Sequence, residues 1–165
     1  ISNYAANQLI CEPNPDTKGC ISFKHITDGT SNQLVLAERK YKAGLPGDRY
    51  VGALVFGRSR NTDSSVNWQA VWSINTPVPC RDYNAWPTTD GSPNGCRNLV
   101  PSSNHPGGAQ FMLGDASVRF ISETIASNPA ATTCGGSNAY NFVGPGFVFQ
   151  NLYTPADGYP IGALD

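Results

Sequence analysis

Apolar and polar residues alternate most regularly over residues 109–113, as in a strand with one buried face. Gly114-Asp115 then indicates a tight turn, because glycine takes the positive φ angles that a short hairpin requires. The alternation resumes over residues 118–121. This pattern predicts a β-hairpin with His105 at its entrance. The residues expected on the buried face of its first strand are Ala109, Phe111 and Leu113.

Weaker apolar runs predict the remaining elements. Residues 28–32 predict a turn, since Asp and Asn side chains bond the backbone two residues on and Gly29 is permissive in φ. In the strand expected after that turn, Leu34 and Leu36 are predicted to share a face. Ser122 is expected to cap a short helical turn. The further strands are expected at residues 21–24, 34–39, 50–56, 68–74 and 147–152. The fold class is therefore mainly β, an antiparallel sheet with long loops.

Length and composition indicate a single domain, residues 1–165, with many turns. Charged residues make up 14% of the chain, against roughly 25% in an average soluble protein. The net charge is −1 and no basic run exists, so nucleic acid and anionic membranes are poor partners. No apolar stretch approaches the length of a membrane-spanning helix.

Five cysteines in a Lys-poor chain favour an oxidising compartment. Short loops make Cys11–Cys20 and Cys80–Cys96 the simplest pairing, which leaves Cys134 over, although the sequence does not settle the connectivity. A bridge between Cys80 and Cys96 would pin the long irregular segment 75–104. Zinc is the competing interpretation, but the chain has no Cys-x-x-Cys and the spacings are irregular.

A histidine, nine residues and then an aspartate, His105 and Asp115, stand within the hairpin run. The run His-Pro-Gly-Gly-Ala-Gln-Phe, continued by Ser-Val-Arg-Phe, resembles the C-terminal signature of the domain of unknown function 1559 (DUF1559), a family of secreted, prepilin-like proteins. Ala116 stands where the family has glycine. A second similar element is residues 26–32, followed by a strand that ends at Glu38. Residues 4–7 resemble an internal strand of the family, and the resemblance therefore implies a strand there. A weaker third element is residues 149–153.

The resemblance implies a globular head of pilin-like type without chemistry of its own, and so not an enzyme. The full-length protein would carry an N-terminal hydrophobic helix, which is absent from this chain, and we expect a form trimmed at Ile1. The implied partners are other pilin-like subunits or cell-envelope components, with a location outside the cell, on its surface or in the periplasm. The motif residues expected to be structural or to bind a ligand are His105, Asp115, Asp28, Asn32 and Glu38.

Three alternatives remain open from the residues themselves. Ser102, Ser103, His105 and Asp115 suggest a hydrolase triad, although no Gly-x-Ser-x-Gly element is present. Hard oxygen ligands could hold calcium near Asp28 or Asp115, and residues 90–94 resemble a calcium loop in composition only. No other cofactor is expected. In a third alternative, a sugar-binding surface would use the loop residues Tyr83 and Trp86, since Trp68 and Trp72 are expected in the core.

Overall fold

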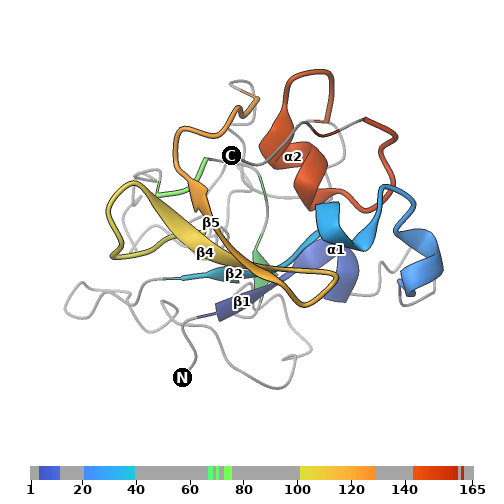
Figure 1. Cartoon of the computed structure of the whole chain (residues 1–165), viewed down its shortest axis with the longest axis horizontal. Coiled ribbons are helices and arrows are strands. Elements are labelled where there is room, and N and C mark those ends of the chain that lie inside the picture. The colour runs from blue at the N-terminus through green and yellow to red at the C-terminus, as the bar shows by residue number, and fades with distance from the viewer. Residues whose placement is uncertain are drawn as a thin grey trace, which may run out of the picture.

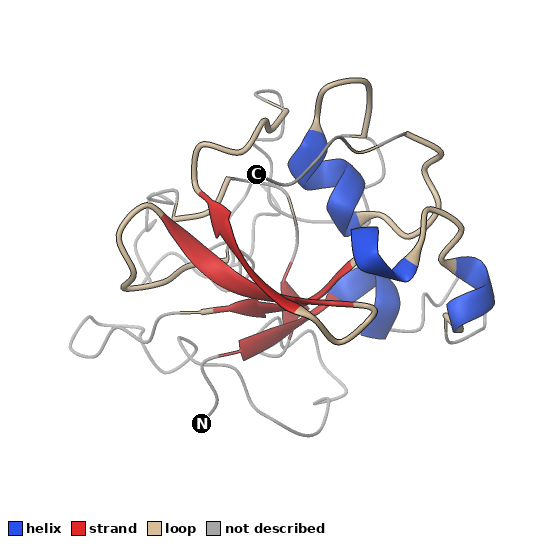
Figure 2. Ribbon diagram, in the orientation of Figure 1, coloured by secondary structure: helices blue, strands red, loops and turns tan. Residues whose placement is uncertain are grey.

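The computed structural model describes residues 4–11, 21–39, 67–68, 70, 73–75, 101–128, 143–159 and 161. Its centre is a sheet with the strand order β3-β1-β2-β4-β5, which α2 covers on one face (Figures 1 and 2). The strands are β1 (Tyr4–Asn7), β2 (Leu34–Glu38), β3 (Asn67–Trp68), β4 (Gly108–Leu113) and β5 (Val118–Ser122). The helices are α1 (Gln8–Cys11), α2 (Val148–Tyr153) and the 3₁₀ turns η1 (Phe23–His25) and η2 (Thr30–Asn32).

The predicted class, mainly β and antiparallel, is confirmed for four of these strands. The exception is the two-residue β3, which pairs parallel to β1. The strands predicted at residues 4–7 and 34–39 and the hairpin at residues 109–121 are all present. The strand predicted at residues 50–56 lies outside the described residues.

Three predicted strands are wrong. Residues 23–25 form η1, in which Phe23 is 74% exposed and has no sheet to pack on. Beyond Trp68, the described part of residues 68–74 forms turns. Residues 148–153 form α2, because Phe149, Leu152 and Tyr153 follow the i, i+3, i+4 spacing of a helix face. Ser122 does begin a turn, in which its carbonyl accepts the N–H of Ile125 at 3.1 Å, but no helix follows.

A shift in register changes which side chains of β2 enter the core. Leu34 pairs with Leu113 and Leu36 with Met112, so the ladder is irregular between them. Such a bulge reverses the alternation of the bulged strand. Leu34 is buried together with Ala37, while Leu36 is only half-buried. The predicted shared face of Leu34 and Leu36 is therefore wrong.

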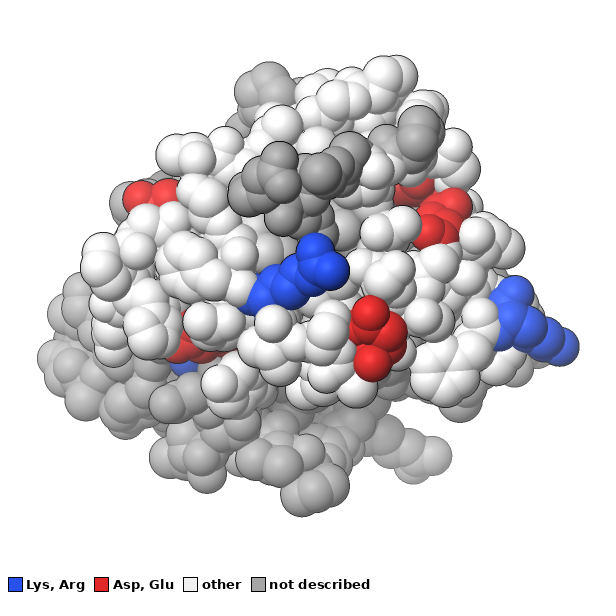
Figure 3. All heavy atoms as spheres, in the orientation of Figure 1, with Lys and Arg blue, Asp and Glu red and all other residues white. Residues whose placement is uncertain are grey.

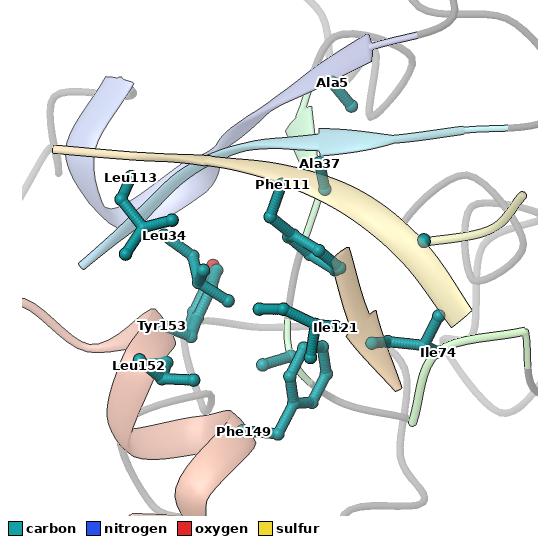
Figure 4. Packing of buried hydrophobic residues seen from close by; sticks show 12 residues of the cluster. Ala5, Leu34, Ala37, Ile74, Phe111, Leu113, Ile121, Phe149, Leu152 and Tyr153 are labelled. Carbon is teal, nitrogen blue, oxygen red and sulfur yellow. The ribbon is translucent and has the colours of Figure 1, made fainter. Parts of the chain in front are cut away.

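The core lies between the sheet and α2 (Figure 4). All three residues predicted for the buried face of β4 are fully buried. Phe111 of β4 meets Phe149 of α2 edge to face, with ring centroids 6.1 Å apart and an interplanar angle of 79°. Such a pair adds about 0.5–1.5 kcal/mol to the burial of the two rings. The other buried apolar residues of this cluster include Leu34, Leu113, Ile121, Leu152 and Tyr153.

Two buried side-chain amides attach the end of α2 to the sheet. Asn7 Nδ2 donates to the carbonyls of Leu34 at 2.7 Å and Tyr153 at 2.8 Å. Gln33 Nε2 donates to the carbonyls of Leu152 at 3.0 Å and Tyr153 at 2.8 Å. The last carbonyls of a helix have no partner within the helix, and burial makes an unpaired carbonyl costly. The amides therefore allow α2 to end inside the protein.

The hairpin turn differs from the predicted one. Leu113 accepts the N–H of Ala116 at 3.0 Å and donates to the carbonyl of Ser117 at 2.8 Å, which encloses a three-residue loop. Such loops place their last residue in the left-handed region. Ala116 takes this place with a φ of 67°, whereas Gly114 has no positive φ. Gly114 is needed for another reason, because a Cβ there would lie 2.9 Å from the carbonyl oxygen of Thr30.

We expect Ala116→Gly to stabilise the protein by about 1 kcal/mol. Glycine avoids the strain of alanine in the left-handed conformation, and this gain exceeds the loss from the greater conformational entropy of glycine in the unfolded chain. Gly114→Ala, two residues away, should destabilise it because the new methyl group meets the backbone of Thr30. Denaturant unfolding of the two variants measures both effects. An unchanged or lower stability of Ala116→Gly would contradict the turn geometry.

We expect Gln33→Ala to lower the free energy of unfolding by about 1–3 kcal/mol, because the carbonyls of Leu152 and Tyr153 lose a donor. Gln110→Ala is the matched control. Gln110 is half-buried in β4, and its side chain makes no hydrogen bond among the described residues. Equal effects of the two substitutions, measured by denaturant unfolding, would argue against the role of Gln33.

Candidate functional site

Glu38 and His105 meet at the end of the β2–β4 pair. Glu38 Oε2 accepts the main-chain N–H of Gln110 at 3.1 Å, and Oε1 lies 3.5 Å from His105 Nε2. The carbonyl of Glu38 accepts the N–H of Ser102 at 2.9 Å. The side-chain carboxylate of Glu38 thus supplies an acceptor for the main chain of β4 at Gln110, just beyond the last main-chain pair of β2 and β4. The His105 side chain is 57% exposed and that of Glu38 16%, so the contact between the two side chains itself contributes little.

A chain of hydrogen bonds positions the entrance of the hairpin. Ser103 Oγ accepts the N–H of His105 at 2.7 Å, and the N–H of Ser103 donates to Asn75 Oδ1 at 2.8 Å. Asn75 Nδ2 donates to Glu123 Oε2 at 3.0 Å and to the carbonyl of Gly108 at 3.3 Å. Asn75 has a φ of 59°, a conformation that asparagine tolerates better than most residues. Its side chain thereby joins the segments before and after the hairpin.

Asp115 lies at the other end of the hairpin from His105 and forms no triad with it. Asp115 Oδ1 accepts the N–H of Ser117 at 2.9 Å and its hydroxyl at 2.6 Å. These bonds from Ser117 lower the pKa of the exposed Asp115 carboxyl. The contact to Ser103 Oγ comes from the main chain of His105, while the His105 ring faces Glu38. A triad of a serine with His105 and Asp115, one of the alternatives left open by the sequence, is therefore not formed.

The two sequence motifs pack against each other at that second end. Asn32 Nδ2 donates to the carbonyl of Asp28 at 3.0 Å, which closes the loop that carries η2. The N–H of Gly114 donates to the carbonyl of Gln33 at 2.8 Å, and Gly114 lies close to Thr30. The family-like residues thus hold both ends of the β2–β4 pair, with Glu38 and His105 at one end and the Asp28 loop and the hairpin turn at the other.

A carboxylate that the sequence analysis missed, Asp157, lies beside Asp28. The N–H of Asp157 donates to Asp28 Oδ2 at 2.9 Å, and Asp157 Oδ1 accepts the N–H of Tyr159 at 2.8 Å. Asp157 Oδ2 is buried without a hydrogen-bond partner among the described residues. Burial, followed by the nearby charge of Asp28, raises the pKa of Asp157. Since 129 residues separate the two aspartates, no local pattern could have paired them.

An open pocket of about 180 Å³ lies beside Asp28 and Asn32. The carboxylates of Asp28 and Asp157 and the amide oxygen of Asn32 are hard ligands, the type that calcium prefers. Calcium takes six to eight oxygens, and the described part of the chain brings no group of three or more His, Cys, Asp or Glu side chains together. The predicted calcium at Asp28 would therefore depend on carbonyl groups and water for most of its ligands. Within the described part of the chain, the hydrogen bonds of the Asp115 carboxylate come from Ser117, and no second carboxylate is among its contacts.

The charged side chains of the described residues are scattered over the face drawn in Figure 3. They lie singly or in small groups among neutral residues. Arg39, which follows β2, is buried, with 1% of its surface exposed. Burial lowers its pKa to about 10, so the guanidinium stays charged at neutral pH. Within the described residues, no helix has the length and apolar character needed to cross a membrane.

The other predicted site residues fall on parts of the chain without described side chains. The predicted bridges use Cys11, whose backbone alone is described in α1, and Cys20, Cys80 and Cys96, which lie outside the described residues. The predicted sugar-binding residues Tyr83 and Trp86 and the calcium-like segment 90–94 also lie outside them. The pairing and the binding surface stay predictions.

Comparison with known proteins decides the family. The sequence profile described as "Protein of unknown function (DUF1559)" matches residues 4–128. The chain belongs to the DUF1559 family. No curated protein and no solved structure matches the chain. The match includes β1 to β5 and both motif segments and ends before α2, so the third family-like element at residues 149–153 lies beyond it.

We expect Asp157→Asn to raise the free energy of unfolding at neutral pH by less than about 1 kcal/mol, allowing for solvent screening. The raised pKa means that the folded state binds more protons than the unfolded state just above the ordinary aspartate value, so stability falls as the pH rises through that window. Substitution by asparagine removes the cost of holding an ionised carboxylate at this position. The difference in unfolding free energy between Asp157→Asn and the wild type should therefore shrink in acid, where Asp157 is protonated.

Asp115→Asn is the control of opposite sign, because the lowered pKa of Asp115 stabilises the fold above that pKa. This variant should be less stable than wild type at neutral pH and equal to it in acid. Thermal unfolding across a pH series, with calcium removed by a chelator, measures both variants. A destabilised Asp157→Asn at neutral pH would contradict the assigned environment.

Proposed function

We propose that this DUF1559 chain is the globular head of a prepilin-like structural subunit, presented outside the cytoplasm, and that it is not an enzyme. The proposal is supported by the contacts of the family-like residues, which are structural. Glu38, His105, Asn32 and Asp115 each engage main-chain groups or one another at the ends of the β2–β4 pair. Side chains that complete ladders and turns serve to hold a shape.

The surface composition supports a role in assembly. Tyr4, Val118 and Phe120 are 49%, 64% and 49% exposed. They belong to the sheet face opposite α2, since the partners of Val118 and Phe120 on β4 are Met112 and Gln110, which alternate with the buried residues. Val118 and Phe120 lie two residues apart on β5, and neighbouring exposed apolar groups of this kind occur on surfaces that contact other proteins. Other pilin-like subunits or cell-envelope components are the proposed partners.

Expression of the precursor with its natural upstream sequence tests this role. We expect that sequence to supply an apolar segment of about 20 residues, which would anchor the head or pack it into a filament. Immunogold electron microscopy should then label filaments or the cell envelope, and a precursor without the segment should be released. An envelope label that is unchanged without the segment, or a native precursor that is fully released, would contradict the proposal.

A substitution series at Glu38 and His105 separates a bracing role from a catalytic one. We expect Glu38→Ala to cost about 1–3 kcal/mol of unfolding free energy, because the N–H of Gln110 loses its acceptor. Glu38→Gln keeps an acceptor oxygen and is the matched control. His105→Ala should cost about 0.2–1 kcal/mol, as exposed pairs do. Loss of a hydrolytic or binding activity in His105→Ala at unchanged stability would show a role in chemistry instead.

A further inference from the structure

Two Asp-Gly dipeptides of the chain meet in the structure. The N–H of Asp157, which precedes Gly158, donates at 2.9 Å to Oδ2 of Asp28, which precedes Gly29. A glycine has no Cβ to hinder its main-chain nitrogen, so this nitrogen can attack the carboxyl group of a preceding aspartate. The sequence offers both dipeptides for this reaction, and the contacts around each one decide which of them reacts. A third dipeptide, Asp90–Gly91, lies outside the described residues.

The dipeptide at Asp28 is fixed by Asn32. Asn32 Nδ2 donates to the carbonyl of Asp28 at 3.0 Å, and the N–H of Asn32 donates to the carbonyl of Gly29 at 3.0 Å. The carbonyl of Asp28 and the N–H of Gly29 belong to one rigid peptide plane. The glycine nitrogen reaches the side-chain carboxyl group only when this plane rotates, so the bond from Asn32 Nδ2 must break first.

The dipeptide at Asp157 has no such restraint within the described part of the chain. Gly158 is exposed, and neither its N–H nor the carbonyl of Asp157 takes part in a hydrogen bond with the described residues. Gly158 also lines the open pocket beside Asp28, which leaves space for the main chain to move. The peptide plane between Asp157 and Gly158 can therefore rotate without breaking a hydrogen bond of its own.

The carboxyl group of Asp157 is held over this peptide. Its Oδ1 accepts the N–H of Tyr159, two residues on, at 2.8 Å, and the turn closed by this bond contains the Gly158 nitrogen. Its Oδ2 is buried and accepts no hydrogen bond from the described residues. Burial, followed by the charge of Asp28, raises the pKa of Asp157, so more of this carboxyl group is protonated than in an ordinary aspartate. The protonated form is the one that loses its hydroxyl group as water.

We propose that Asp157 is a modification site, at which the folded protein converts aspartate to isoaspartate while Asp28 is protected. The Gly158 nitrogen forms a bond to Cγ of Asp157, and the proton of the nitrogen and the carboxyl hydroxyl group leave together as water. Water then adds to the main-chain carbonyl of the resulting succinimide and breaks its bond to the nitrogen, so that the chain continues through Cγ. The reaction needs no oxidant or reductant and leaves the mass unchanged. It does not rest on the proposed function.

Incubation of the folded chain at neutral pH, with a chelator present, tests the proposal. Peptide mapping by electron-transfer dissociation distinguishes isoaspartate from aspartate at each position. We expect isoaspartate to accumulate at Asp157 at least about tenfold faster than at Asp28, the rate factor that corresponds to an opening step of about 1.4 kcal/mol. Equal rates at the two positions, or a faster reaction at Asp28, overturn the proposal.

The same chain in concentrated urea is the reference, and both samples are incubated until the urea sample contains isoaspartate. Both dipeptides lose their contacts in urea, so their rates should become similar. A preference for Asp157 that persists there comes from the local sequence and overturns the role of the fold. Absence of isoaspartate at Asp157 in the folded sample overturns the proposal as well. Asp115 is an internal control that should react slowly, because Ala116 carries a Cβ and its N–H is bonded to Leu113.

Variants separate the two positions. Asp157→Glu keeps a carboxylate but requires a larger ring, so it should stop the reaction at this position and leave Asp28 unchanged. Asn32→Ala removes the side-chain bond to Asp28 and should raise the rate at Asp28 toward its value in urea. Asn32→Asp, which keeps the shape and loses the donor, serves as a second variant if Asn32→Ala folds poorly. A rate at Asp28 that stays unchanged in a folded Asn32 variant overturns the protection assigned to that bond.

Discussion

Two buried side-chain amides, Asn7 and Gln33, connect the C-terminal helix to the sheet. α2 has only six residues, far fewer than an isolated helix needs to be stable in water. Its last carbonyls accept hydrogen bonds from these amides, and its apolar residues Phe149 and Leu152 complete the core over β4. Without the amides, burial of the helix end would leave carbonyls unpaired, and the core would lose the layer that closes it.

Other amides extend the same principle along α2. Gln150 Nε2 donates to the carbonyl of Ala70 at 3.0 Å and to Ser127 Oγ at 2.9 Å, while its Oε1 accepts the N–H of Asn128 at 3.0 Å. Asn151 exchanges two hydrogen bonds with Gly144. Buried amides of this kind exclude alternative positions of the helix, because every other position would leave several polar groups unsatisfied. They also join segments that contribute no regular secondary structure.

The family-like residues act on the pair of strands at the centre of the sheet. β2 and β4 are neighbours in the sheet although about 70 residues separate them, so the ends of the pair need specific contacts. Glu38 supplies these at one end, and the loop that begins at Asp28 supplies them at the other. The face of the sheet opposite α2 carries the exposed residues Tyr4, Val118 and Phe120, and it is the surface through which we propose that the protein meets its partners.

The sequence by itself determined the features that depend on neighbouring residues. The alternation over residues 109–113 predicted β4 and its buried face, and the composition of residues 28–32 predicted a turn, because periodicity and turn chemistry act over a few residues. The family was also evident from the spacing of His105 and Asp115, and the matching profile confirmed it.

The tertiary structure decided the features that depend on distant residues. Residues 148–153 have enough apolar character for a strand or a helix, and they form a helix where distant amides receive its end. The bulge in β2 exchanged Leu36 for Ala37 in the core, because the register with β4 sets which side chain faces inward. Asp157 lies beside Asp28 although 129 residues separate them. Ala116 takes the left-handed conformation that was expected of a glycine, because the hydrogen bonds that close the hairpin require this conformation there.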